Sequence, residues 1–278
     1  MRTLAIVGVG LLGGSIALAA RARGVAERIV GVDRDAAALE KARRRCGLDE
    51  CFTEAAPAVR QADITVFCTP VDEIAEQVVA AASHCGPGSV LTDVGSTKAA
   101  IVRGLENRLP PDCRFVGSHP LAGSEKCGAG HAQAHLFEGR LVVVTPTEKT
   151  DRDSLKEVRG FWQALGSHVV EMTPEDHDRA VARTSHLPHL VAAALAGGLE
   201  QELRELTASG FRDTTRVAGG DALLWTGVLL QNREAILDAL GDFEAELGRF
   251  RAALHGDDRA AIEALLTHAK RNRDALGS

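Results

Sequence analysis

The sequence predicts two kinds of structure in succession: an α/β part built on a doubly wound, Rossmann-type sheet, and then an all-α part. Short β-rich runs alternate with helical patterns up to residue 172, and the runs are almost continuously apolar. Strands of this kind occur in parallel sheets that helices cover on both faces. Beyond residue 173 no further strand is apparent, so we predict domains at 1–172 and 173–278.

Individual elements follow from these patterns and from their capping residues. The expected strands are Thr3–Val7, Arg28–Val32, Ile64–Cys68, Ser89–Asp93, Arg114–Gly117, Leu141–Thr145 and His168–Glu171. The expected helices between them are Leu11–Arg23, Ala36–Arg45, Val71–Ser83, Thr97–Leu109 and Asp151–Leu165. Later helical patterns cover 174–206, 221–230, 232–254 and 258–275, with expected N-caps at Thr173, Asp221 and Asp257.

Composition excludes several classes of protein. The 278 residues are 45% hydrophobic and 25% charged, with a net charge of −6, so we expect neither nucleic acid nor an anionic membrane as a partner. No apolar run approaches the length of a membrane span. The six cysteines form no Cys-x-x-Cys pair, which favours reduced thiols and a cytoplasmic location.

A regular apolar seam runs along the expected helix 232–254. Its members recur at alternating spacings of four and three: Ile236, Leu240, Phe243, Leu247, Phe250 and Leu254. Such a seam fits a helix buried within one subunit, or one that also packs across a two-fold axis. Its narrowness in an all-helical domain favours a homodimer.

A glycine-rich turn lies between the first strand and the first helix. Its glycines are Gly8, Gly10 and Gly13, with Leu11 and Leu12 between the last two. The first glycine permits a tight turn, the second lets the backbone approach a pyrophosphate, and the third lets the helix lie close to the strand. The pattern is weak alone, but in this strand–turn–helix context it predicts a dinucleotide site formed by these residues.

The end of the second strand indicates which dinucleotide binds. Asp33 follows Gly13 by the distance typical of the carboxylate that binds the adenosine ribose. A carboxylate there repels a 2′-phosphate, so NAD is favoured over NADP. Arg34 is the competing signal, because an arginine at this place can accept that phosphate; we expect it instead to cover the adenine or to be solvated.

Two further strand ends lie at the same predicted edge, where doubly wound sheets bind ligands. Thr69 and Pro70 follow one strand and are expected to contact the cofactor. The segment Asp93–Lys98 follows the next, and Ser96 or Thr97 there could equally be a simple helix N-cap.

His119 follows the strand Arg114–Gly117 and precedes Pro120, so it is expected at the cofactor edge. A neutral imidazole beside a nicotinamide can accept a hydroxyl proton while the adjacent carbon loses hydride. Such a dehydrogenase would also need an anchor for an acidic substrate, usually an arginine.

The helical part offers candidates for that anchor. His186 and His189 lie three residues apart in SHLPH, and Arg216 ends FRDTTR ahead of Trp225. The two histidines could be core residues or metal ligands; with no third ligand at a useful spacing, we expect no metal.

GVGLLGGS, DVGSTK, SHPLAGSE, SHLPH and FRDTTR with a following tryptophan together resemble the prephenate/arogenate (cyclohexadienyl) dehydrogenase family of tyrosine biosynthesis. The resemblance covers nearly the whole chain in the same order. The SHPLAGSE and SHLPH elements are its specific parts. It implies a prephenate dehydrogenase that oxidises prephenate with NAD and releases CO2, 4-hydroxyphenylpyruvate and NADH.

The resemblance also implies roles for individual residues. His119 corresponds to the catalytic histidine that binds the C4 hydroxyl, and Ser96 to a serine that orients it. Arg216 matches an arginine that binds a substrate carboxylate, His189 a pocket histidine, and Glu125 an acidic residue at the pocket edge. The helical domain of the family forms a dimer.

Three alternatives remain at this point. The first is the same reaction on arogenate, or on both substrates, since Glu125 could pair with the amino group of arogenate. The second is a reductase of β-hydroxy acids or cyclic imines, disfavoured by the lack of a catalytic lysine motif. The third is a non-catalytic NAD sensor, which would have no use for His119 with Arg216.

Overall fold

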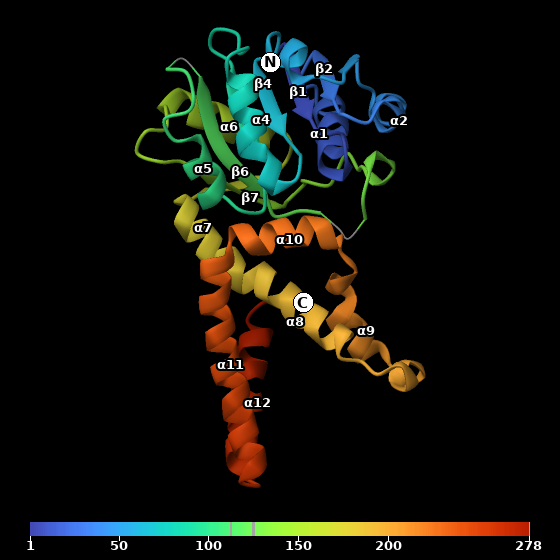
Figure 1. The fold of residues 1–278 in the computed structure, drawn as a ribbon, viewed down its shortest axis with the longest axis vertical. Helices are drawn as coiled ribbons and strands as arrows, with labels where there is room; N and C mark the ends of the chain where they lie inside the picture. Colours follow the sequence, from blue (N-terminus) through green and yellow to red (C-terminus); the bar gives the residue numbers. More distant parts are fainter. Residues whose placement is uncertain (112, 124–125, 278) are drawn as a thin grey trace. The chain divides into compact units, whose positions relative to one another are not determined.

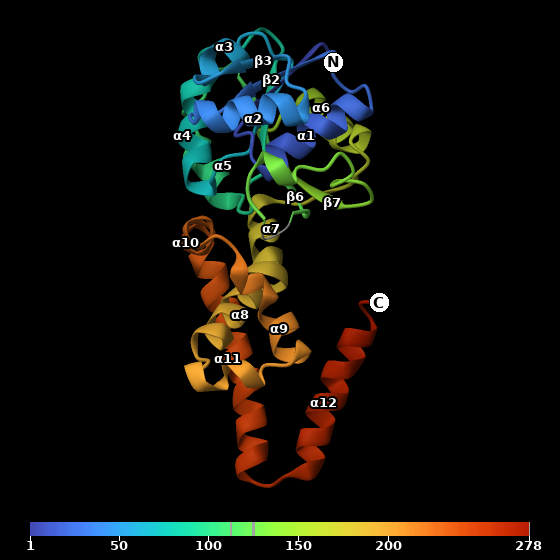
Figure 2. The ribbon, with the colours of Figure 1, turned by 90° about the vertical axis from the view of Figure 1, so that its right-hand side faces the viewer.

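The structure is a computed structural model that describes residues 1–111, 113–123 and 126–277. The chain forms two compact units, Met1–Arg233 and Glu234–Ser278. The first contains the sheet, its covering helices and the first part of the all-helical region (Figures 1 and 2). The domain boundary predicted at residue 172 falls inside it and stays a prediction.

A single sheet of eight strands lies at the centre of the first unit, in the order β3-β2-β1-β4-β5-β6-β7-β8. The strands are β1 Thr3–Val7, β2 Arg28–Val32, β3 Glu50–Phe52, β4 Ile64–Phe67, β5 Val90–Asp93, β6 Arg114–Pro120, β7 Leu141–Thr145 and β8 His168–Glu171. The sequence did not predict the short strand β3. Strands β1 to β6 pair in parallel, as expected for a doubly wound sheet.

The far edge of the sheet departs from the expectation of an all-parallel sheet. Strand β7 pairs antiparallel with β6, and β8 pairs parallel with β7. The apolar pattern of β7 is the same for either direction, so the sequence could not indicate this reversal. The reversal gives the end of β6 a hydrogen-bonding partner beyond the reach of β5.

Helices cover both faces of the sheet (Figure 2). The helices are α1 Leu11–Ala22, α2 Ala36–Cys46, α3 Ala55–Val59, α4 Val71–Ala82, α5 Ala99–Leu105 and α6 Arg152–Ala164. Alternate side chains of β1 pack into two different hydrophobic cores. Leu4 and Ile6 belong to a core with residues of α1, α2 and α6, and Ala5 belongs to a core with residues of α3, α4 and α5. This alternation is what a strand buried on both faces produces, and it confirms the doubly wound class.

The helical region of the first unit is more broken than the sequence predicted. The expected helix 174–206 consists of α7 Pro174–Val181, a π-helical turn Ala182–His186, α8 Leu187–Gly197 and a 3-10 turn Gln201–Leu206. Helices α9 Ser209–Thr215 and α10 Ala222–Gln231 follow, with a 3-10 turn, η4 Arg216–Gly219, between them. Pro188 lacks the N–H that a continuous helix requires, which accounts for the irregular turn before it.

Capping residues explain where these helices begin. Thr173 accepts a hydrogen bond from the Asp176 N–H at 3.1 Å, with Pro174 in the first turn, as predicted. Asp221 likewise accepts from the Leu224 N–H at 2.9 Å.

The second unit consists of two helices, α11 Arg233–His255 and α12 Arg259–Asp274 (Figure 2). Asp258, not the predicted Asp257, caps α12, because Asp257 turns through the left-handed region with φ 48°. In α11 the seam residues Leu247 and Leu254 are 51% and 64% exposed. Among the described residues no helix is long and apolar enough to cross a membrane.

Candidate active site

In the glycine turn between β1 and α1, two of the three glycines have no room for a side chain, and the third faces open space. A Cβ on Gly8, whose φ is +91°, would lie 2.8 Å from the carbonyl oxygen of Cys68. A Cβ on Gly13 would lie 2.1 Å from the oxygen of Gly8. A Cβ on Gly10 would meet no atom within 4 Å. The turn therefore leaves open space at Gly10, which is what the predicted approach of a pyrophosphate to the backbone requires.

A cavity of about 600 Å³ opens at the carboxyl ends of β1, β2 and β4. The predicted cofactor residues that line it are Gly8, Gly10, Asp33, Arg34, Thr69 and Pro70. Gly13 is buried at the start of α1, and Leu11 and Leu12 are half-buried there. The predicted residues that line the cavity are thus gathered at the edge expected for a dinucleotide.

Asp33 is held in place by the backbone around it. Its Oδ2 accepts from the Val9 N–H at 3.2 Å, and its Oδ1 from the Asp35 N–H at 3.1 Å. The carboxylate is half-buried beside the glycine turn and lines the cavity. This position fits a carboxylate that binds free ribose hydroxyls.

Arg34 has a carboxylate partner that the sequence analysis missed. Its Nη1 lies 3.4 Å from Oε1 of Glu73, in the first turn of α4. Glu73 also accepts from Gln77 at 2.9 Å, and Gln77 contacts the Thr69 hydroxyl at 2.6 Å. A second acidic side chain, Glu73, therefore lines the same cavity as Asp33, which favours NAD over a 2′-phosphorylated cofactor.

His119 lies within a strand and not after one. The sequence predicted that the strand would end at Gly117, but β6 continues to Pro120 because β7 pairs with it there. His119 is paired with Val143 of β7 and is 8% exposed. The imidazole is therefore fixed by a sheet, on the strand segment that extends past the end of β5.

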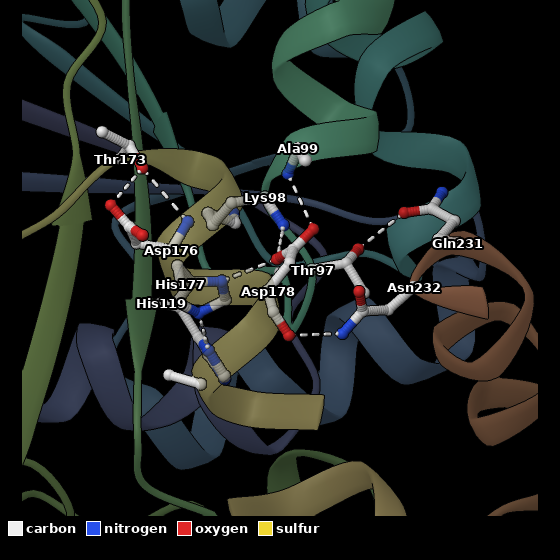
Figure 3. Close-up of polar contacts among 12 residues, drawn as sticks. Thr97, Lys98, Ala99, His119, Thr173, Asp176, His177, Asp178, Gln231 and Asn232 are labelled. Atoms are coloured by element: carbon white, nitrogen blue, oxygen red, sulfur yellow. Dashed lines mark hydrogen bonds and ion pairs between the residues drawn. The ribbon is translucent and has the colours of Figure 1, made fainter. Parts of the chain in front are cut away.

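His119 contacts a second histidine, His177 of α7 (Figure 3). Their Nδ1 and Nε2 atoms are 2.8 Å apart, and Nδ1 of His177 lies 2.7 Å from Oδ1 of Asp178. Burial, together with nearby His177, Lys98 and His186, lowers the pKa of His119 well below its usual value. His119 is therefore neutral at neutral pH, as a proton acceptor must be.

A buried ion pair supports the backbone next to His119. Nζ of Lys98 contacts the carboxylate of Asp93 and donates to the Ser118 carbonyl at 3.0 Å. Asp93 in turn accepts from the Ser118 N–H at 3.1 Å. Lys98 and Asp93 are both fully buried, so the pair fixes the end of β5 against β6.

The loop after β5 carries Ser96, which is half-buried. Among the described residues no hydrogen bond joins Ser96 to His119, so its orienting role stays a prediction. The simpler alternative, in which Ser96 or Thr97 is the N-cap of α5, is wrong: Lys98 occupies the N-cap position, and its side chain makes no capping hydrogen bond. The Thr97 hydroxyl instead contacts Gln231 at 2.6 Å, and the N–H groups of Lys98 and Ala99 are capped by Asp178 (Figure 3).

The two histidines of SHLPH are buried and form an aromatic cluster with the half-buried Trp225. The ring of His189 stacks on Trp225 with centroids 3.5 Å apart, and that of His186 meets Trp225 edge-on at 6.1 Å. In the described parts of the chain, Nε2 of His186 and Nδ1 of His189 have no hydrogen-bond partner. Buried ring nitrogens without partners are uncommon, which fits a pocket that a ligand completes.

The two other predicted substrate residues are less fully placed. Arg216 is exposed at the start of η4, which packs against α8, the helix of His189. Glu125 lies outside the described residues. Across the described residues, no group of three or more His, Cys, Asp or Glu side chains is arranged to hold a metal ion.

The fold and site define a class of protein: an NAD-dependent dehydrogenase with a dinucleotide site and a neutral buried histidine at one sheet edge. Family models identify it further. The nucleotide-binding domain of prephenate dehydrogenase matches residues 16–171, and the prephenate dehydrogenase dimerization domain matches residues 173–268. The chain belongs to the prephenate dehydrogenase family.

Individual relatives agree with this assignment. The chain is 33% identical to prephenate dehydrogenase of Bacillus subtilis over 99% of its own length and 76% of the relative. It superposes on prephenate dehydrogenase of Aquifex aeolicus, solved with hydroxyphenyl propionate and NAD+, with a TM-score of 0.92 and 33% identity, covering 99% and 98% of the two chains. It also superposes on an arogenate dehydrogenase from Synechocystis with a TM-score of 0.83 and 34% identity, covering 99% of each chain.

Proposed function

We propose that this chain is a prephenate dehydrogenase that converts prephenate and NAD into 4-hydroxyphenylpyruvate, CO2 and NADH. The main support for the proposal is the position of His119. Its imidazole is buried and neutral, and it lies at the edge of the sheet where the dinucleotide cavity opens. Membership of the prephenate dehydrogenase family supplies the substrate class. In the proposed reaction, His119 is the group that carries the proton.

In the proposed reaction, His119 accepts the proton of the C4 hydroxyl as the C4–H bond breaks. NAD, when bound, supplies the acceptor for the hydride. Oxidation at C4 allows the bond between the ring and the ring carboxylate to break, which releases CO2. The electron pair of that bond makes the ring aromatic. His119 then returns its proton to the resulting phenolate oxygen, so the reaction releases no net proton.

The remaining predicted residues hold the two reactants. We assign Gly8, Gly10 and Gly13 with Leu11 and Leu12 to the pyrophosphate turn. Asp33, Arg34, Thr69 and Pro70 are assigned to the rest of the cofactor cavity. Their shared position at one sheet edge supports this assignment.

Substrate binding is assigned to Arg216 and His189, with Ser96 orienting the ring hydroxyl beside His119. Nδ1 of His189, which has no hydrogen-bond partner among the described residues, supports its part in this assignment. Glu125 remains a proposed contact on the strength of sequence resemblance alone. Two carboxylates of prephenate would need such cationic and polar partners.

Arogenate is the second candidate substrate, alone or beside prephenate. The 34% identity to the Synechocystis arogenate dehydrogenase supports arogenate as a candidate substrate. Arogenate would undergo the same oxidation at C4 and yield tyrosine.

We also propose that the protein is a cytoplasmic homodimer that associates through its helical domain at 173–278. The match of residues 173–268 to a dimerization domain supports this, as do the exposed seam residues Leu247 and Leu254. Sedimentation of the purified protein tests it: a stable monomer at micromolar concentration would contradict the dimer.

Product analysis tests the proposed reaction. The purified protein should form NADH, CO2 and 4-hydroxyphenylpyruvate in equal amounts from prephenate and NAD. Formation of NADH without CO2 would contradict the assigned chemistry, and a lack of any turnover would contradict the function.

A further inference from the structure

Three side chains form one buried hydrogen-bonded chain that ends at His119 (Figure 3). His119 contacts His177 at 2.8 Å, and His177 contacts Asp178 at 2.7 Å. The three residues are 8%, 0% and 4% exposed, so water does not compete for these bonds. They come from β6 and from the first turns of α7.

The Asp178 end of this chain is anchored by donors. Its Oδ1 also accepts from the Lys98 N–H at 2.8 Å, and its Oδ2 accepts from the Ala99 N–H at 2.9 Å. Both N–H groups belong to the start of α5, which has no capping side chain of its own. Both of these groups are N–H donors, so both oxygens of the Asp178 carboxyl group accept hydrogen bonds, and a proton on Nδ1 of His177 completes the third contact.

An acceptor at one end fixes the protons along the chain. Nδ1 of His177 must carry a proton to donate to Asp178, so the Nε2 of a neutral His177 is unprotonated. That Nε2 can only accept, so Nδ1 of His119 must donate to it. The proton of neutral His119 is therefore on Nδ1, and its Nε2 holds the free lone pair.

The surrounding charges are consistent with this proton order. The charged or titratable groups that act on His119 are His177 of α7, Lys98 of the loop after β5, and His186 of the π-helical turn. Lys98 is neutralised by Asp93, and burial lowers the pKa of His186 to about 4. Asp178 is thus the nearby anion toward which the hydrogen bonds of His119 are directed.

We propose that His177 and Asp178 are positioning residues: they hold His119 in the tautomer whose Nε2 accepts the substrate proton, and they fix the direction of its ring. The proposal rests on the proposed function for the identity of the proton that Nε2 accepts. A carboxylate orients a catalytic imidazole in the same way in serine hydrolases, where no second imidazole intervenes.

Ring nitrogens report the tautomer directly, without any assay of activity. Two-bond ¹H–¹⁵N correlation spectra of the wild-type protein should show His119 protonated on Nδ1 and bare on Nε2. Its signals among the ten histidines are assigned by their loss in His119→Asn. Protonation of His119 on Nε2 in the wild-type protein would overturn the proposal.

Two substitutions of His177 separate positioning from folding. In His177→Gln the amide can still accept from Nδ1 of His119, whereas in His177→Asn the shorter side chain reaches only Asp178. We expect kcat to fall on the order of 10- to 100-fold in His177→Asn. It should stay within about fivefold of wild type in His177→Gln, with the KM for NAD unchanged in both.

Asp178→Asn and a surface control complete the test. In Asp178→Asn, the amide NH2 replaces one carboxyl oxygen and faces a donor that this oxygen now accepts from. The proton of His177 is then no longer fixed on Nδ1, so His119 should appear as a mixture of tautomers and kcat should fall. His168→Asn, at an exposed histidine of β8, should change neither. Full kcat in His177→Asn would also overturn the proposal. If the wild-type protein did not oxidise prephenate but His119 still carried its proton on Nδ1, only the proposed function would fail.

Discussion

The Thr97 hydroxyl and the Gln231 side chain are 2.6 Å apart and connect the loop after β5 to the last turn of α10. Gln231 also donates to the Val71 carbonyl at 2.8 Å, at the start of α4. The helix that carries Trp225 is therefore fixed to the carboxyl edge of the sheet by side chains. This connection brings the aromatic cluster of the helical region to the edge that holds the dinucleotide cavity and His119.

Replacing His119 by asparagine should remove the proton acceptor and leave the rest of the site intact. We expect turnover of prephenate to fall about 10²- to 10⁴-fold, the usual contribution of a general base. The dissociation constant of NAD, measured by calorimetry, should barely change because His119 does not line the cofactor cavity. Activity close to wild type in His119→Asn would refute its role.

Arg216→Ala should weaken the binding of substrate with little effect on kcat. A lost charge pair with a carboxylate costs about 2–4 kcal/mol when buried. Because Arg216 is exposed here, we expect the lower end of that range, a KM for prephenate roughly 30-fold higher. Arg212→Ala, at an exposed arginine one helical turn earlier, is the matched control. An unchanged KM in Arg216→Ala would remove that residue from the site.

Two glycine substitutions should separate NAD binding from folding: one should weaken NAD binding, and the other should lower the stability of the fold. Gly10→Val places its side chain in open space, so the thermal midpoint should hold while the affinity for NAD falls at least about tenfold. Gly13→Ala forces a Cβ to within 2.1 Å of the Gly8 oxygen, so the fold itself should lose stability. Scanning calorimetry with and without NAD measures both effects. Normal NAD affinity in Gly10→Val would contradict the proposed place of the pyrophosphate.

Buried histidines should make the free energy of unfolding depend on pH. Burial lowers the pKa of His186 to about 4, while a histidine in the unfolded chain titrates near 6.5. Between these values the unfolded chain binds more protons, so stability is full above about pH 6.5 and is lost as the pH falls toward 4. For His186 the loss is about 3 kcal/mol, and His119, whose pKa is also lowered, adds in the same direction.

Urea unfolding at a series of pH values measures this dependence. The slope between about pH 6.5 and pH 4 should be smaller in His186→Asn than in the wild-type protein. Equal slopes in the two proteins would show that His186 does not carry the effect.

Most of the sheet could be predicted because its strands are short apolar runs with clear ends. The bounds of β1, β2, β7 and β8 agree with the predicted ranges. Strand β3 and helix α3 were missed because they are only three and five residues long, and α3 contains a proline. Runs this short leave too few residues for a hydrophobic period.

The cofactor turn and His119 could be identified from local motifs, but the support of His119 could not. The sequence around His177 and Asp178 is rich in charge and resembles a solvated helix. Their burial comes from contact with β6 and the start of α5, which are distant in sequence. Local patterns do not encode such contacts; an adjacent histidine and aspartate in the first turns of a helix were the only signal.

The specificity constants of the wild-type protein for prephenate and for arogenate, each with NAD and with NADP, test the central claim most directly. The proposed function predicts the highest value for prephenate with NAD, and 4-hydroxyphenylpyruvate as the product. Turnover of arogenate alone would contradict the assigned substrate, and a preference for NADP would contradict the role given to Asp33 and Glu73.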